Sequence, residues 1–228
     1  TDQGQYTQAE PLLQRTLSIY EKFLDVNHPE VATTVGNLAQ LYLRQGQYAK
    51  SEPLFQQALA IDEKSLGINH PRVAFDLRGL AEIYQAQGQY AQAQPLYQRA
   101  LAIQEKSLGA DHPDIAKTLH RLAEIYILKE QYAQALSELR RASAIYRQRI
   151  VAAGVDDAAS REAASGQTSL FLHLFLLVVN LDKEPPAKIT DEALQIVQLI
   201  QSSGTASAIA KMAARFASGS DNMAMLTK

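Results

Sequence analysis

One segment of 42 residues is followed along this chain by close copies of itself. Residues 28–69 and 70–111 are identical at 24 of their 42 aligned positions. A third copy begins at residue 112 and keeps the motif Leu-Ala-x-x-Tyr, which ends at Tyr42, Tyr84 and Tyr126 in the three copies. A fixed period of about 20–50 residues predicts a stacked array of one supersecondary unit. The period therefore constrains the fold more than any other feature of the sequence.

Each unit contains two helical patterns separated by one turn. In the first pattern, Val31, Val35, Leu38 and Tyr42 recur at intervals of three and four residues, which gives a helix with one apolar face. Gly46 then interrupts the pattern, where a tight turn needs a permissive backbone. A second amphipathic pattern follows the turn. We name the two predicted helices of each unit helix A and helix B.

The predicted array occupies residues 1–150. The chain opens in mid-repeat, because Tyr6 and Pro11 align with Tyr48 and Pro53 of helix B. We therefore expect the sequence to be a piece of a longer protein. The expected units are a half repeat at 1–27 and whole repeats at 28–69, 70–111 and 112–153.

The order Leu-Ala-x-x-Tyr, Gly-x-Tyr, Ala, Phe or Tyr, Ala resembles the tetratricopeptide repeat. The longer period, with Glu-Lys-Ser-Leu-Gly and His-Pro between units, is similar to the kinesin-light-chain variant of that repeat. The resemblance implies an all-α fold, a right-handed superhelical array of antiparallel helix pairs. Units of this kind must stack, since one unit cannot bury its apolar face alone.

Residues 154–228 are expected to form a helical extension that caps the array, with its first helices as a degenerate repeat. Its apolar run at 170–181 is too short to cross a bilayer, which takes about twenty residues. We expect it to be a buried helix that docks on the last repeat. The segment 208–217 and the Ser-Gly-Ser-Asp that follows it resemble the region before the CHAT protease domain of bacterial repeat proteins.

Composition limits the kinds of partner. A net charge of −2, without a basic stripe and interleaved aromatic residues, argues against a nucleic-acid-binding protein. The absence of Cys excludes disulfides, thiol nucleophiles and Cys-rich zinc sites within this sequence. No signal segment or membrane span is recognisable, and we expect a cytoplasmic protein that does not insert into a membrane.

No catalytic or cofactor-binding motif is present, so we expect neither enzymatic activity nor a cofactor. His28, His70 and His112 recur once per unit and raise the question of a metal site. Equivalent positions two helices apart are separated by about 18–20 Å in packed helices. Zinc needs ligands about 2 Å away, so these three residues cannot share one ion. We interpret them as turn residues at the start of helix A.

The resemblance implies that helix A lines the concave face, where these arrays bind peptides. Kinesin light chains carry Asn-Asn directly before Leu-Ala, and only Asn37 retains that amide here. We expect four basic side chains against two acidic ones on the face, with an exposed Phe75 as apolar anchor. The candidate peptide-binding residues are Asn37, Gln40, Arg44, Phe75, Arg78, Glu82, Lys117, His120, Arg121 and Glu124.

Two functions follow from these observations. The first is a non-catalytic protein-interaction scaffold that binds a partner protein or a peptide, of acidic character, on the helix A face. The alternative is a module for self-association, or for support of a C-terminal effector domain of the CHAT type, whose groove is unused.

Overall fold

The computed structural model describes residues 2–153, and every element of that part is an α-helix. The expected extension 154–228, its docking on the last repeat and its CHAT-like segment lie outside the described residues. The helices are α1 (Asp2–Phe23), α2 (Pro29–Arg44), α3 (Tyr48–Leu66), α4 (Pro71–Ala86), α5 (Tyr90–Ser107), α6 (Pro113–Leu128) and α7 (Tyr132–Ala153).

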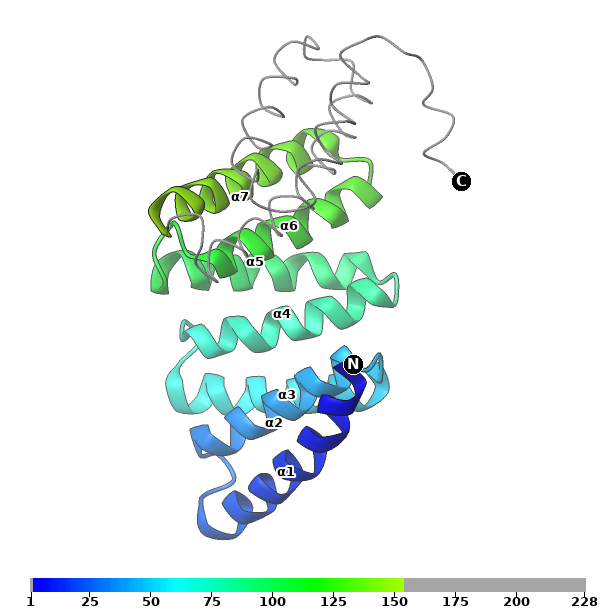
Figure 1. The fold of residues 1–228 in the computed structure, drawn as a ribbon, viewed down its shortest axis with the longest axis vertical. Helices are drawn as coiled ribbons and strands as arrows, with labels where there is room; N and C mark the ends of the chain where they lie inside the picture. The colour runs from blue at the N-terminus through cyan, green and yellow to red at the C-terminus, as the bar shows by residue number, and fades with distance from the viewer. Residues whose placement is uncertain (1, 154–228) are drawn as a thin grey trace. The chain divides into compact units, whose positions relative to one another are not determined.

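The helices pair as the period predicts. Helix A and helix B of each unit are antiparallel neighbours, namely α2 with α3, α4 with α5, and α6 with α7 (Figure 1). Residues 1–110 form one compact unit, in which α1 packs on α2 and α3 packs on α4. The pair α6–α7 belongs to a second unit, from residue 111 onward, and is described by itself.

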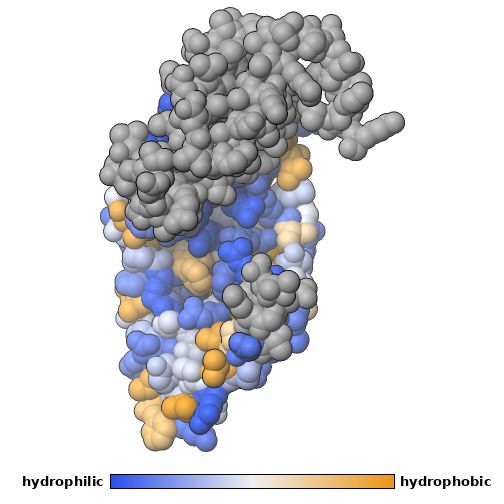
Figure 2. Space-filling view, in the orientation of Figure 1, coloured by the Kyte–Doolittle hydropathy of each residue, from blue (hydrophilic) through white to orange (hydrophobic). Residues whose placement is uncertain are grey.

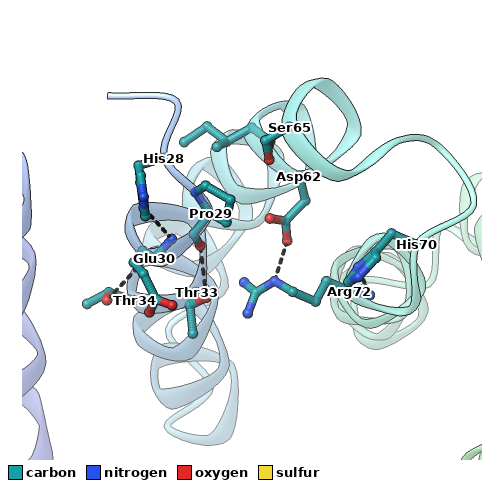
Figure 3. Close-up of polar contacts among 10 residues, drawn as sticks. His28, Pro29, Glu30, Thr33, Thr34, Asp62, Ser65, His70 and Arg72 are labelled. Carbon is teal, nitrogen blue, oxygen red and sulfur yellow. Dashed lines mark hydrogen bonds and ion pairs between the residues drawn. The ribbon is translucent and has the colours of Figure 1, made fainter. Parts of the chain in front are cut away.

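The three histidines cap the N-termini of α2, α4 and α6, which are the helix A elements. His28, His70 and His112 have extended backbones, and the imidazole Nδ1 of each accepts a hydrogen bond from the backbone N–H two residues later, at 3.2–3.3 Å. Proline follows each histidine in the first turn, where its missing N–H costs nothing. Figure 3 shows the caps at His28 and His70. The interpretation of these residues as helix-start residues is confirmed.

The turn between helix A and helix B ends each helix A in the same way. The N–H groups of Gln47, Gln89 and Gln131 bond to the carbonyl five residues earlier, at 2.8–2.9 Å, which is the Schellman pattern. The residue before each glutamine needs a positive φ, which Gly46 supplies at 71° and Gly88 at 76°. In the third unit Glu130 adopts a φ of 59° instead. The turn geometry is therefore kept even where glycine is not.

Small residues let the helices of a pair approach closely. Ala39, Ala81 and Ala123 on helix A and Ala58, Ala100 and Ala142 on helix B are fully buried, as their recurrence predicts. The hydroxyl of Ser51 donates to the Ala39 carbonyl at 2.7 Å, so a polar side chain at this contact is also satisfied.

The recurring tyrosines of helix A also contact the preceding helix B. The Tyr42 hydroxyl donates to Glu10 at 2.8 Å, and the Tyr84 hydroxyl donates to Glu52 at 2.9 Å. Burial, and then the bond to Glu52, raise the pKa of Tyr84. Tyr42 is buried, but Tyr84 is only half-buried. Tyr84 is therefore a half-buried residue at the contact between two units.

Candidate binding face

The candidate face in residues 1–110 is built on α2 and α4, which lie next to each other. A Cβ atom added to Gly36 would lie 3.6 Å from the Phe75 ring and 3.2 Å from the Asp76 carboxylate. The two helices therefore approach closely at this glycine. The candidate residues follow at intervals of three and four on each helix and so share one side of it. Those residues are Asn37, Gln40 and Arg44 on α2, with Phe75, Arg78 and Glu82 on α4.

The α2 part of the face carries the amides. Asn37 and Arg44 are exposed, and Gln40 is half-buried. Among the described residues, the Gln40 Nε2 atom is buried and has no hydrogen-bond partner. A buried amide that lacks an acceptor loses hydration without recovering it, at a cost of about 1–3 kcal/mol. A ligand carbonyl at this atom would remove that cost.

The α4 part of the face is less open than expected. Phe75 is half-buried against the core, with its ring centroid 6.0 Å from that of Phe55. The guanidinium of Arg78 lies 5.9 Å from the centroid of the Phe75 ring. Arg78 also lies 3.9 Å from the carboxylate of Glu82, and both side chains are mostly buried. Phe75 is therefore mainly a packing residue, and the charge of Arg78 is largely balanced.

The α6 residues form their own set in the second unit. Lys117 lies 3.6 Å from Asp114, and Arg121 lies 3.0 Å from Glu124. His120 is 3.7 Å from the same glutamate. Each basic side chain of this set thus has an acidic neighbour within one turn. Because exposed pairs of this kind screen each other, the set produces little net field.

Comparison with known proteins identifies the repeat. The tetratricopeptide repeat model matches residues 1–64, 35–106 and 73–148, which together span more than half of the chain. The chain belongs to the tetratricopeptide repeat family. No curated protein sequence matches it significantly.

Solved structures place this repeat among kinesin-light-chain-like arrays. The chain is similar to BtubC (BKLC) from P. vanneervenii at 19% identity and a TM-score of 0.67, over 97% of this chain and 77% of that one. It is similar at 25% identity and a TM-score of 0.60 to a kinesin-light-chain-type protein of Podosopora anserina with nearly identical TPR-like repeats, over 88% of each chain. The chain is also similar to the apo form of RapI, at 17% identity and a TM-score of 0.56, over 92% of this chain and 75% of that one. The expected fold and kinesin-light-chain-like repeat type are confirmed.

The tetratricopeptide repeats also enclose a charged cluster that the sequence analysis missed. Asp62 on α3 and Asp76 on α4 are fully buried, and Arg72 on α4 donates from Nε to Asp62 at 2.9 Å. The alignment of the three repeats with one another could have revealed this cluster. Aspartate occupies position 76 where the other two units have Thr34 and Thr118.

The described part of this tetratricopeptide repeat chain contains no group of three or more His, Asp or Glu side chains arranged to hold a metal ion. None of its helices is both long enough and apolar enough to span a bilayer.

Proposed function

We propose that this chain is a non-catalytic protein-interaction module that binds an extended segment of a partner protein across α2 and α4. The observation that carries the proposal is the pair of amides on α2. Asn37 is exposed, and the Gln40 amide nitrogen, one turn further on, is buried without a hydrogen-bond partner among the described residues. Side-chain amides both donate and accept, so they pair with a peptide backbone whatever its sequence.

The charged side chains among the candidate residues determine how strongly an acidic ligand is attracted. Three of the four basic side chains, Arg78, Lys117 and Arg121, lie beside acidic ones, so they give little attraction for an acidic peptide. Arg44 is exposed in the last turn of α2. The helix dipole is negative at this end, so any attraction for an acidic residue comes from the Arg44 side chain itself. We propose that the ligand is held mainly through its backbone and that one acidic residue of it contacts Arg44.

The test uses peptides selected from a random display library against the full chain. We expect the double variant Asn37→Ala, Gln40→Ala to weaken binding by about tenfold or more, because two hydrogen bonds at about 0.5–1.5 kcal/mol each are lost. Arg44→Glu should weaken acidic peptides specifically. Arg78→Glu with Arg121→Glu should leave the binding of uncharged peptides nearly unchanged, because the proposal has these peptides held through their backbone at Asn37 and Gln40.

The matched control replaces two exposed amides of helix B, Gln57→Ala and Gln92→Ala. It removes the same chemical groups from α3 and α5 and should leave the Kd unchanged. Equal weakening by both double variants, measured by titration calorimetry, would contradict binding on the α2–α4 face. Failure to select any peptide would contradict the proposed peptide-binding function.

One side of α1 is apolar and exposed, and the repeat pattern accounts for it. Leu12, Ile19 and Phe23 are 65%, 46% and 80% exposed and lie on one side of the helix. Their repeat equivalents Leu54 and Ile61 pack against α2, which is helix A of the same unit. Figure 2 shows apolar surface at the lower end of the view, where Figure 1 places the end of α1. This side of α1 is therefore the one that helix A covers in a whole repeat, and its exposure is not evidence for self-association.

A further inference from the structure

The most unusual buried site in residues 1–110 joins three helices. Asp62 comes from α3, Arg72 and Asp76 come from α4, and the backbone of α2 approaches at Gly36. Both carboxylates are fully buried, whereas the Arg72 side chain is 30% exposed. Figure 3 shows Arg72 extending from α4 to the Asp62 carboxylate of α3. The site is therefore a contact between repeat 28–69 and repeat 70–111.

The hydrogen bonds of this site are too few for two carboxylates. Arg72 donates to one oxygen of Asp62. Among the described residues, the other oxygen of Asp62 and both oxygens of Asp76 are buried without a donor. Two ionised carboxylates against one guanidinium would leave a net negative charge away from water. That charge costs several kcal/mol in a protein interior, and proton uptake is the cheaper outcome.

The surrounding charges favour the proton on Asp76. Burial, and then the negative charge of Asp62, raise the pKa of Asp76 to about 8. Arg72 lowers that pKa but does not cancel the rise.

Other charged groups on the three helices are turned to different partners or to solvent. Glu30 of α2 is exposed. Glu63 of α3 pairs with Arg99, and Arg78 of α4 pairs with Glu82. Asp62 and Arg72 are thus the charges that act on Asp76.

The other repeats show that the site is a set of coordinated departures from the pattern. This contact has Asp62, Arg72 and Asp76. The residues aligned with them 42 positions earlier are Tyr20, Glu30 and Thr34. Those aligned 42 positions later are Gln104, Asp114 and Thr118. Thr34 and Thr118 donate to carbonyls of their own helices, at 2.9 and 3.0 Å. The aligned threonines therefore satisfy their hydroxyls without taking up a proton.

We propose that Asp62 and Asp76 share one proton in the folded protein, and that loss of this proton loosens α4 from α2 and α3. The contact between repeats 28–69 and 70–111 is then a pH-sensitive joint. An ionised Asp76 faces the Asp62 charge and the α2 backbone at Gly36, and only separation of the helices brings water to it. The fold thus contains a conformational device that needs no ligand.

The sign of the pH dependence follows from linkage. An unfolded aspartate loses its proton near its ordinary pKa of 3.8, whereas the folded chain keeps the proton of Asp76 until about pH 8. Between these values the folded state binds more protons, so rising pH lowers the stability contributed by this group. Loosening is therefore expected on the alkaline side of neutrality.

The first measurement is a carboxyl ¹³C NMR titration of the full chain labelled at aspartate. We expect one signal to titrate several pH units above the others, with a midpoint near 8. Titration of every aspartate below pH 6 would overturn the proposal. This measurement needs no variant, so it shows whether an aspartate keeps its proton above neutral pH even if substitutions at the site prevent folding.

The second measurement is amide hydrogen exchange across the full chain at pH 6 and pH 9, expressed as protection factors. We expect protection of the α4 amides to fall by about tenfold or more in the parent, and to be unchanged in Asp76→Thr, which carries the residue of the aligned repeats. The exposed Asp111→Asn is the control and should behave as the parent does. The same pH dependence in the parent and in Asp76→Thr would overturn the proposal.

Discussion

Tyr97→Ala is expected to lower the free energy of unfolding by about 3–5 kcal/mol. Tyr97 is among the largest side chains in the described part of the chain that are fully buried, and its hydroxyl donates to Gln85 at 2.9 Å. Truncation removes an aromatic ring from a closely packed site and leaves a cavity that the helices cannot fully close. Tyr97→Phe keeps the ring and should cost only about 1 kcal/mol, the net value of one hydrogen bond.

Tyr84→Ala is the matched comparison. Tyr84 also donates to a side chain, Glu52, but its ring is half-buried, so we expect about half the loss of Tyr97→Ala. Urea unfolding followed by far-UV circular dichroism measures both variants. Equal losses for the two tyrosines would show that burial does not rank their contributions.

Gly79→Ala is expected to destabilise the chain by about 2–4 kcal/mol, although alanine is the better helix former by about 1 kcal/mol. A Cβ atom at Gly79 would lie 2.3–2.6 Å from three atoms of the Phe55 ring, far inside van der Waals contact. Phe55 is fully buried, so its ring can shift only by displacing closely packed neighbours. Overpacking therefore outweighs the gain in helix propensity.

Two further variants decide whether the Phe55 ring is the cause. Gly36→Ala adds the same methyl group to α2, where the nearest atoms are 3.2–3.7 Å away, and should change the urea midpoint much less. Phe55→Leu, which introduces the residue found at the aligned positions Leu13 and Leu139, should partly rescue Gly79→Ala. If Gly79→Ala costs the same with and without Phe55→Leu, the steric explanation is wrong.

The helices and their ends were predictable because each depends on local chemistry. His-Pro starts helix A since the imidazole and the proline ring act within one turn, and Gly46 ends it since its positive φ is a property of one residue. The buried face of helix A followed in the same way from spacings of three and four residues. The family followed as well, because the 42-residue period carries these local signals three times.

The candidate face was predictable only as a set of positions. Spacing places Arg78 and Glu82 on one side of α4 and therefore predicts two charges available to a ligand. In the structure they lie 3.9 Å apart and are mostly buried. Phe75, expected as an open anchor, is packed against Phe55 instead. Such pairings depend on rotamers and on the neighbouring helix, neither of which the spacing specifies.

The sequence by itself determined the pairing of the helices, the start of helix A, the turn after it and the family, because a repeated local pattern needs no knowledge of distant residues. Only the tertiary structure decided which side chains meet between units. Phe55 and Gly79 are 24 residues apart and fit together by size, while Asp62 and Asp76 come to share a site from which water is excluded. Steric fit and the protonation of a buried carboxyl depend on everything within a few ångströms, and that neighbourhood exists only after the helices have packed.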